Sequence, residues 1–443
     1  MKSNKSSAVE GFKLIFRSLQ YRNYRLFFGG QGISLIGTWM QKLALSWLIY
    51  RLTNSAFLLG FVGFTSQIPT FFLGPFSGVV ADRLNRLRII ITTQTLYTIQ
   101  AFVLAFLVLY GHIQVWQIIL LSIFSGLVDA FDIPTRQAFV IEMVEKKEDL
   151  GNAIALNSMM FNGARLIGPS IAGILIAAFG EGICFLLNGI SYIAVIIALF
   201  AMKISPRKPR SQNTHIFEEL KEGFNYAFNF IPIRMILLLL NLLSLMGLPY
   251  VILMPVFARD ILKGGPHTLG FLMGATGIGA LMGALFLASR KKVLGLEKII
   301  PVAGSIFCIG IIAFSFSRIL LVSLILMVTV GFGMMAQLAS MNTVIQTIVD
   351  DDKRGRVMSI YAMAFMGTTP FGSLISGYLA SKIGAGNTLM IGGICCLVGV
   401  IIFYNNLPAL RKTIHPIYVK IGIIPEVAKG LRIATELSSP PEN

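Results

Sequence analysis

Long apolar stretches, separated by short polar ones, follow one another along nearly the whole chain. Each is close to the roughly 20 residues that an α-helix needs to cross the hydrocarbon core of a bilayer. The pattern predicts twelve such helices at 25–50, 56–80, 89–110, 116–136, 153–178, 183–202, 231–258, 267–288, 298–316, 319–345, 357–382 and 388–407. We therefore expect an all-α integral membrane protein with twelve transmembrane helices in two six-helix halves.

A polar stretch at 203–230 separates the two halves. Its first part is rich in Pro and basic residues, which predicts an exposed linker. Its second part places Phe217, Leu220, Phe224 and Ala227 at helical spacing, which predicts an amphipathic helix on the membrane surface. The predicted units are an N-terminal half with an amphipathic N-terminal segment at 1–202, a cytoplasmic linker at 203–230, a C-terminal half at 231–407 and a cytoplasmic tail at 408–443.

Composition agrees with this reading, since 55% of the residues are hydrophobic and only 13% are charged. A soluble protein could not bury so much apolar surface. The tail is too short for a catalytic domain, and the chain has no P-loop motif, so we expect neither an enzyme nor an ATPase. All four cysteines lie within apolar segments without metal-site spacing, so no metal site and no cofactor is expected.

The net charge of +17 follows the membrane topology. If the N-terminus is cytoplasmic, most of the 37 Lys and Arg residues fall on the cytoplasmic side. Such an excess is typical of cytoplasmic loops, so both termini are expected there and the protein is expected in the inner membrane. Residues 1–24 lack a cleavable signal, so the first helix is expected to remain as an anchor. The charge gives no reason to expect a nucleic-acid partner.

Two segments carry polar stripes at helical spacing. A polar stripe in the membrane faces either a water-filled cavity or polar partners, because lipid would leave it unsatisfied. The stripe of segment one contains Gln31, Ser34, Thr38, Gln41 and Lys42, and that of segment four contains Ser122, Ser125, Asp129, Asp132 and Arg136. With Arg165 of segment five, these residues are the candidates for the cavity lining.

Asp129 and Asp132 are the acids placed deepest within an apolar segment. A carboxyl group in such surroundings can take up and release a proton, which makes both residues candidates for proton coupling. The alternative is a permanent structural pair with Arg136 or Arg165. Lys42 is open to two readings as well. It would either bind an anion and repel a cation within the cavity, or extend to the outer interface.

The sequence GPFSGVVADRLNRLR at 74–88 combines a small-residue helix end with a basic loop. We expect Asp82 to accept hydrogen bonds from the start of segment eleven near Arg356, closing the cytoplasmic side. Arg83, Arg86 and Arg88 would pair with the acids of 142–149, or would serve only as positive anchors. Gly74 and Gly78 complete this predicted cytoplasmic gate.

Segment five contains a second small-residue element, formed by Gly163, Gly168, Pro169 and Gly173. Glycines let helices approach closely, and a proline bends a helix. The element therefore predicts close helix packing.

The motif at 74–88 resembles the loop between the second and third helices of the major facilitator superfamily. Further stretches are similar to its enterobactin-exporter and macrolide-efflux branch. They are GTWMQK at 37–42, LTNS at 52–55, DIPTRQAF at 132–139, NAIALNS at 152–158, LMPVFARD at 253–260, RGRVMS at 354–359 and GIIPEV at 422–427. In this branch position 42 is often Arg and position 129 often Asn, whereas this chain has Lys42 and Asp129.

The resemblance implies a secondary transporter that works by alternating access, with segments one, four, seven and ten around a central cavity. It implies that the element around Pro169 seals the two halves at the periplasmic side and favours efflux. We expect a monomer in the lipid bilayer that exports a small amphipathic molecule, such as a siderophore, drug or metabolite, in exchange for protons. The alternatives are facilitated or uptake transport of a metabolite or lipid, and a membrane sensor or scaffold that transports nothing.

Overall fold

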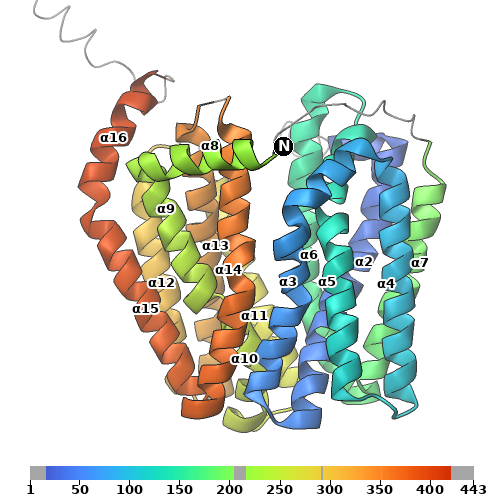
Figure 1. Cartoon of the computed structure of the whole chain (residues 1–443). Helices are drawn as coiled ribbons and strands as arrows, with labels where there is room; N and C mark the ends of the chain where they lie inside the picture. The colour runs from blue at the N-terminus through green and yellow to red at the C-terminus, as the bar shows by residue number, and fades with distance from the viewer. Residues whose placement is uncertain (1–15, 204–215, 291–292, 351, 421–443) are drawn as a thin grey trace, which may run out of the picture.

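The structure, a computed structural model, describes residues 16–203, 216–290, 293–350 and 352–420. Figure 1 shows two bundles of long helices that stand side by side and meet near one end. All twelve predicted segments coincide with helical segments, and no boundary differs by more than three residues. The prediction of an all-helical membrane fold is thereby confirmed.

The first bundle consists of the N-terminal helices, whose long apolar stretches leave polar residues mainly on faces turned toward other helices. They are α2 (Arg22–Thr53), α3 (Ala56–Arg83), α4 (Arg86–Leu109), α5 (Val115–Phe139), α6 (Leu150–Phe179) and α7 (Glu181–Phe200). The second bundle contains α11 (Pro266–Ala288), α12 (Leu296–Phe316), α13 (Leu320–Ile348), α14 (Arg354–Ile383) and α15 (Ala385–Asn405).

The seventh segment differs from the continuous helix that was expected over 231–258. It consists of α9 (Ile231–Leu242), the π-helical turn η4 (Leu243–Gly247), α10 (Tyr250–Val256) and a second π-helical turn η5 (Phe257–Ile261). The amide of Leu248 bonds to the carbonyl of Leu243 at 2.8 Å, which is the wider π spacing. Pro249 follows directly and has no amide hydrogen to donate, so it cannot continue the α-helical ladder.

Ten helical stretches of the described chain are long and apolar enough to cross a membrane by composition alone. The helices α2 and α14 are not among them, although they have 32 and 30 residues. Both carry polar residues on a face that lines the interior, such as Thr38 and Gln41 on α2 and Thr369 and Ser373 on α14. Their lower hydropathy therefore reflects a polar inner face.

The two bundles touch through the pairs α3–α14 and α6–α11, and glycines make both contacts possible. A Cβ atom at Gly60 would lie 2.8 Å from the Cα of Gly377, and one at Gly173 would lie 2.9 Å from the Cα of Gly270. No larger residue fits at either crossing without moving the backbone. These crossings lie at the end of the bundle opposite α8 (Ile216–Asn229) (Figure 1).

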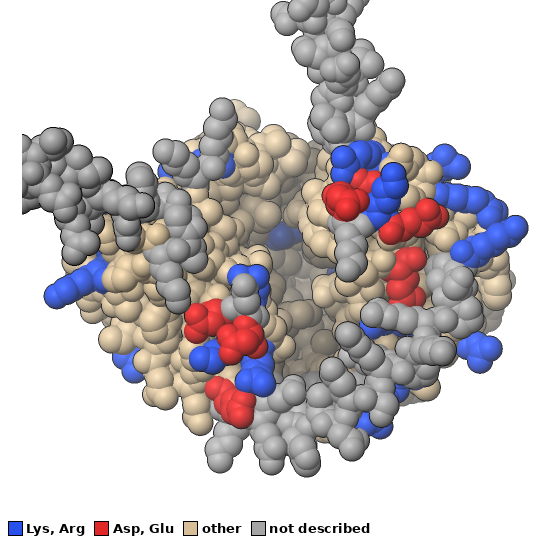
Figure 2. Space-filling model, turned by 90° about the horizontal axis from the view of Figure 1, so that it is seen from above, with Lys and Arg blue, Asp and Glu red and all other residues tan. Residues whose placement is uncertain are grey.

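At the end that carries α8 the bundles separate. Figure 2 views this end and shows a deep hollow between the two halves, with Asp and Glu gathered on the rims. On the C-terminal rim, Arg356 of α14 pairs with Glu222 of α8 at 2.6 Å. On the same half, Arg411 of α16 (Leu407–Lys420), the last helix of the described residues, bonds to Glu297 at 3.0 Å. Residues 408–420 of the predicted tail thus belong to a helix.

The N-terminal rim is held by Asp149, which is almost fully buried. The hydroxyl of Tyr21 donates to its carboxylate at 2.6 Å, and Arg17 forms an ion pair with it. The Tyr21 hydrogen bond and the Arg17 charge hold the pKa of Asp149 below its usual range. Residues Arg17–Gln20 form a short 3-10 helix here. The rest of the predicted amphipathic N-terminal segment lies outside the described residues.

Candidate functional site

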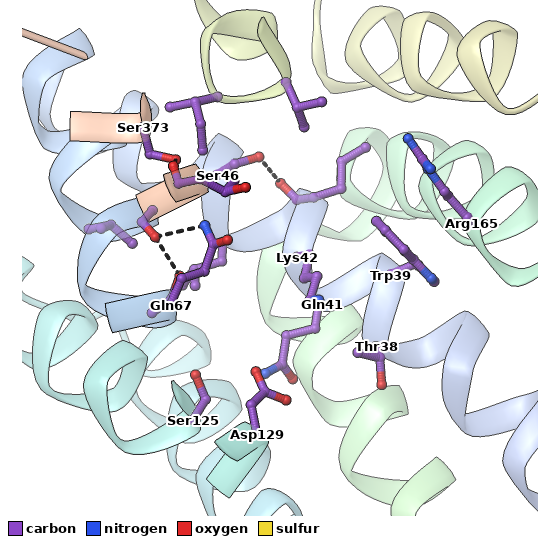
Figure 3. Close-up of a pocket in the computed structure, with 18 of the residues that line it drawn as sticks. Thr38, Trp39, Gln41, Lys42, Ser46, Gln67, Ser125, Asp129, Arg165 and Ser373 are labelled. Carbon is purple, nitrogen blue, oxygen red and sulfur yellow. Dashed lines mark hydrogen bonds between the residues drawn. The ribbon is translucent and has the colours of Figure 1, made fainter. Parts of the chain in front are cut away.

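A cavity of about 480 Å³ lies between the two halves. Its volume is within the range of sites for small ligands, which is roughly 300–1,000 Å³. Its lining comes from α2, α3, α4, α5, α6 and α7 on one side and from η4–α10, α11 and α14 on the other. Figure 3 shows the polar side chains that point into it.

The structure divides the polar stripe of α2 between two environments. Thr38, Gln41 and Lys42 line the cavity. Ser34 and Gln31 lie one and two helical turns before Thr38, are almost fully buried between helices, and do not line it. On α2 the lining therefore begins near the middle of the helix.

The stripe of α5 is divided in the same way. Ser125, Asp129 and Arg136 line the cavity, whereas Ser122 is buried and donates to the carbonyl of Ile118 at 2.7 Å. Asp132 has no exposed surface, so its carboxyl group lies behind the cavity wall. The two aspartates on this helix thus have different surroundings, which their spacing in the sequence did not predict.

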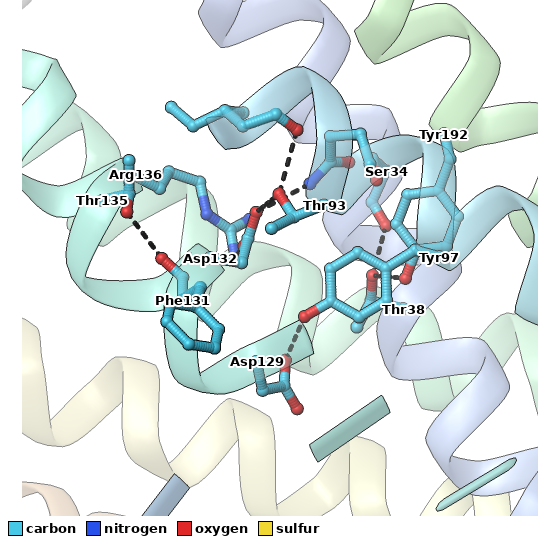
Figure 4. Close-up of polar contacts among 12 residues, drawn as sticks. Ser34, Thr38, Thr93, Tyr97, Asp129, Phe131, Asp132, Thr135, Arg136 and Tyr192 are labelled. Atoms are coloured by element: carbon cyan, nitrogen blue, oxygen red, sulfur yellow. Dashed lines mark hydrogen bonds and ion pairs between the residues drawn. The ribbon is translucent and has the colours of Figure 1, made fainter. Parts of the chain in front are cut away.

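Asp132 is held by three groups (Figure 4). Thr93 donates to its Oδ1 at 2.7 Å and Gln94 donates to the same oxygen at 3.0 Å, while Arg136 forms an ion pair with its Oδ2. An ion pair with further hydrogen bonds keeps a buried carboxylate charged. This geometry favours the structural reading of Asp132, one of the two readings that the sequence left open.

Asp129 faces the cavity and has no ion pair among the described residues. The hydroxyl of Tyr97 donates to its Oδ1 at 2.5 Å. The ring of Tyr97 stacks on Tyr192 with 5.3 Å between centroids, and the hydroxyl of Tyr192 lies 3.1 Å from that of Thr38. The carboxyl group of Asp129 is therefore positioned by one helix and remains open to the cavity on its other side.

Lys42 and Arg165 meet at one aromatic ring. The Nζ of Lys42 lies 5.1 Å from the centre of the Trp39 ring, and the Cζ of Arg165 lies 5.8 Å from the same ring. Both distances are within the range in which a cation is attracted to the face of an indole. Figure 3 shows the Trp39 indole beside both side chains at the cavity wall.

Sequence reasoning missed the polar face of α4. Gln94, Tyr97 and Gln100 of this helix all line the cavity. Gln100 accepts a hydrogen bond from Gln41 at 2.9 Å, and Asn188 of α7 donates to the oxygen of Gln41 at 2.8 Å. The positions 94, 97 and 100 repeat at helical spacing, so the same search for stripes would have found them.

The C-terminal wall of the cavity differs in chemistry, because it carries no charged residue among those described. It presents mainly Leu, Val, Ile and Met side chains, and Thr369 and Ser373 of α14 are its hydroxyl groups. All the charged groups of the cavity lining lie on the N-terminal half. The cavity is therefore polar and charged on one side and largely apolar on the other.

The structure brings some of the predicted gate residues together. Arg86 bonds to Glu142 at 2.9 Å, which is one of the pairs that the sequence suggested. Arg356 pairs with Glu222 of the linker helix, and Asp149 pairs with Arg17. The side chain of Asp82 lies outside the described part of the structure.

The remaining gate residues make few contacts in this conformation. Arg83 and Arg88 have exposed side chains. A Cβ atom at Gly74 or Gly78 would meet nothing within 4 Å. These two glycines therefore border open space on α3.

The residues of the predicted packing element of α6 have three different surroundings. A Cβ at Gly168 would collide with Trp39 and Ile36 of α2, within the same half. Pro169 and Gly173 face Gly270 of α11, in the other half. Gly163 has no neighbour within 4 Å of such an atom. Only the end of the element around Pro169 and Gly173 thus packs the two halves together.

The end of the cavity opposite α8 is closed by polar contacts between the halves. The Nη1 of Arg259 donates to Asn54 at 2.7 Å, and the Cζ of Arg259 lies over the ring of Tyr50. The Tyr50 hydroxyl bonds to Asp260. Asn54 ends α2 in a left-handed conformation with φ 50°. The η5 turn thus binds the end of α2 through two of its side chains, Arg259 and Asp260.

We expect Arg259→Gln to open this end more often, because the substitution removes a charged hydrogen bond between the halves. A cysteine placed at Ser46 in the cavity should then react several-fold faster than in the protein with Arg259. The reagent is a membrane-impermeant maleimide added from the side opposite α8. Arg51→Gln is the matched control, since Arg51 pairs with Glu181 within one half at 2.7 Å. Equal labelling rates in the two variants would show that the Arg259 contact does not hold the end closed.

Comparison with known proteins agrees with the fold and the cavity. The family model described as "Transmembrane secretion effector" matches residues 16–416. The staphyloferrin A transporter of Staphylococcus aureus is 25% identical and covers 86% of this chain and 95% of its own. Macrolide efflux protein A of Streptococcus pyogenes is 22% identical, covering 88% and 99%. The enterobactin exporter EntS of Shigella boydii is 25% identical, covering 85% and 91%.

Among solved structures, a bacterial homolog of the human lysosomal transporter Spinster, in an inward-facing and unoccupied conformation, matches with a TM-score of 0.69. It is 12% identical and covers 89% of this chain and 98% of its own, which shows a shared fold. The resemblance drawn from the sequence motifs is confirmed by these matches. The chain belongs to the transmembrane secretion effector family of major facilitator transporters, a family of transporters and not of enzymes.

Proposed function

We propose that this protein exports a small amphipathic molecule from the cytoplasm by proton-coupled alternating access. Three relatives are named for the transport or export of a siderophore or a macrolide, which supports an exporter of molecules of this kind. The cavity supports the same reading, because it has a charged wall and an apolar wall and a volume that suits a small ligand. The proposed substrate is a siderophore, drug or metabolite.

Alternating access requires a second conformation in which the end near α8 closes. The excess of Lys and Arg at this end favours a cytoplasmic location, so the conformation described here would be open to the cytoplasm. In the closed state Gly74 and Gly78 would let α3 approach α14 closely. Asp82 would accept hydrogen bonds from the start of α14, and Arg83, Arg88 and Arg356 would exchange their partners. We place both termini in the cytoplasm and the protein, as a monomer, in the inner membrane.

The carboxyl group of Asp129 carries the proposal of proton coupling. It lines the cavity, it lacks an ion-pair partner among the described residues, and it is positioned by Tyr97. A carboxyl group with these properties can exchange its proton with whichever side the cavity faces. Asp132 is the second candidate, but its pairing with Arg136 favours a permanently charged carboxylate.

The charge of the substrate sets the direction in which the proton moves. A cationic substrate competes with the proton for Asp129, which gives exchange of one for the other. An anionic substrate is repelled by ionised Asp129, so it binds together with the proton and both cross in the same direction.

Accumulation in cells tests the proposed direction. Cells that express the protein should retain less of at least one compound from a panel of siderophores, macrolides and organic acids than cells with an empty vector. The Lys382→Gln variant should behave as wild type, because Lys382 lies outside the cavity over the ring of Tyr378. Higher retention of a compound by expressing cells would instead establish uptake and would refute export.

A further inference from the structure

We propose that the cavity binds the anionic head group of an amphipathic substrate between Lys42 and Arg165. The apolar body of the substrate would lie against the C-terminal half. This inference rests on the proposed transport function, because it specifies the ligand of the same cavity. It adds the sign of the ligand's charge and its orientation.

Lys42 lies in the membrane-spanning part of α2, and its side chain is exposed to the cavity. None of the ion pairs among the described residues includes it. An ammonium group at this depth is costly unless water or a counter-charge compensates it. Its contact with the face of Trp39 supplies only part of that compensation. A negative group from a ligand would supply the rest.

Arg165 also lacks an ion-pair partner among the described residues. Its guanidinium group donates to the sulfur of Met334 at 3.9 Å, and sulfur is a weak acceptor. Other arginines of the described chain have carboxylate partners, including Arg51, Arg86 and Arg136. A guanidinium group can bind a carboxylate or a phosphate through two parallel hydrogen bonds. Arg165 has no carboxylate partner among the described residues, so a ligand anion could take that place.

The carboxylates of the cavity do not balance these two cations. Asp132 already compensates Arg136, and that pair contributes no net charge. Asp129 is the remaining carboxylate of the cavity lining. Two cations therefore face one carboxylate, or none when Asp129 is protonated. The lining attracts an anion in both protonation states, and it attracts one more strongly when Asp129 carries a proton.

The opposite wall fixes the orientation. The apolar part of this wall comes from three elements of the C-terminal half: Leu248, Val251 and Ile252 of the seventh segment, Leu269 and Met273 of α11, and Met366 of α14. Methionine adapts its shape to apolar ligands of different outline. A molecule with one charged end would place that end at Trp39 and its apolar end across the cavity. A second charged end would have no partner on this wall.

The proton on Asp129 should influence this binding. The charged and titratable groups that act on Asp129 are Lys42 of α2, Tyr97 of α4, Asp132 and Arg136 of α5, and Tyr192 of α7. Lys42 lines the same cavity as Asp129 and has no ion-pair partner among the described residues. An anion at Lys42 and an ionised Asp129 thus compete for the same cation. By linkage, binding of the anion should be accompanied by uptake of a proton.

Three fluorescent probes that share one apolar body test the inference. Dansylglycine is anionic, dansylglycinamide is neutral and dansylethylenediamine carries a free ammonium group. Each is titrated into the purified full-length protein in phosphatidylcholine nanodiscs, and dansyl emission is followed with excitation of the tryptophans. We expect dansylglycine to bind at least tenfold more tightly than the neutral probe, and the cationic probe to bind most weakly.

Two variants and one control identify the residues. Lys42→Gln and Arg165→Gln should each reduce the preference for the anionic probe by about tenfold while leaving binding of the neutral probe unchanged. Lys382→Gln is the control, because Lys382 also lies near an aromatic ring, 6.0 Å from Tyr378, but outside the cavity.

Adding an anionic phospholipid to the nanodiscs distinguishes two sources of the ligand. Competition with dansylglycine indicates a lipid head group, and no competition indicates a water-soluble amphipath.

The inference is overturned if the neutral or the cationic probe binds as tightly as dansylglycine, if no probe binds at millimolar concentration, or if both cavity variants keep the wild-type preference. Because the assay measures binding, it is independent of the direction of transport. A clear preference for the anion in a protein that does not lower cellular retention would refute export and leave the anion site standing. Export by a protein whose binding shows no preference for charge would support the transport function and refute the anion site.

Discussion

Replacing Asp129 by Asn should make the binding of an anionic ligand almost independent of pH. In the wild-type protein, affinity for dansylglycine should fall as the pH rises, because ionised Asp129 repels the anion and attracts Lys42. Two unit charges at roughly 8 Å interact by about 2 kcal/mol at an effective dielectric constant of about 20, so we expect a change of at least about tenfold. The asparagine keeps the affinity of the protonated state at every pH.

The measurement is a titration of dansylglycine at several pH values between 5 and 9. Asp350→Asn is the matched control, because Asp350 is an exposed carboxylate on the rim and should not alter the pH dependence. If Asp129→Asn retains the pH dependence of the wild type, the proton that is linked to binding sits on another group. Asp132 would then be the next residue to replace.

The same substitution should also change the energetics of transport. An anion that moves with one proton crosses without net charge, so the membrane potential neither drives nor opposes it. The free energy that drives its export is then that of the outward substrate gradient. It is reduced by about 1.4 kcal/mol for each pH unit by which the outside is more acidic. With Asp129→Asn the anion would move alone, and a potential that is negative inside would drive it outward by about 2.3 kcal/mol per 100 mV.

Replacing Arg136 by Gln should destabilise the protein by about 3 kcal/mol, because it leaves the carboxylate of Asp132 buried without its counter-charge. Asp132 has no exposed surface, and the hydrogen bonds from Thr93 and Gln94 cannot replace a full positive charge. Thermal unfolding of the purified protein in detergent is the measurement. The melting temperature should fall clearly below that of the wild type.

The double variant Asp132→Asn/Arg136→Gln is the control that isolates the pair. An amide at position 132 can still accept hydrogen bonds from Thr93 and Gln94, so we expect the double variant to recover most of the lost stability. Non-additivity of this kind is expected for two residues in direct contact. A double variant as unstable as Arg136→Gln alone would mean that the guanidinium stabilises the helices through other contacts.

Most of the fold could be predicted from the sequence because the bilayer imposes a simple rule. Every backbone polar group must be satisfied within the membrane, so long apolar segments become helices and their ends follow the polarity of the chain. The seventh segment is the exception. Pro249 follows the first of its two π-helical turns and Pro255 precedes the second. A hydropathy pattern contains no information about such local turns.

The site could be predicted only in part. Helical spacing singles out faces of α2 and α5 from which Thr38, Gln41, Lys42, Ser125, Asp129 and Arg136 line the cavity, but it cannot say how far along a helix the cavity extends. Gln31, Ser34 and Ser122 therefore belong to the stripes without lining the cavity. The different surroundings of Asp129 and Asp132 depend on α4, which supplies Tyr97 to one and Thr93 to the other. A partner on another helix cannot be read from the spacing on one helix.

The most direct test of the account is a flux measurement with the purified protein in liposomes that contain a pH-sensitive dye. Siderophores, macrolides and anionic amphipaths are added in turn, and the movement of protons is recorded for the wild type and for Asp129→Asn. We predict that at least one anionic amphipath causes proton movement in its own direction, and that Asp129→Asn carries the compound without the proton. Transport by the wild type without any proton movement, or equal proton movement in both proteins, would contradict this prediction.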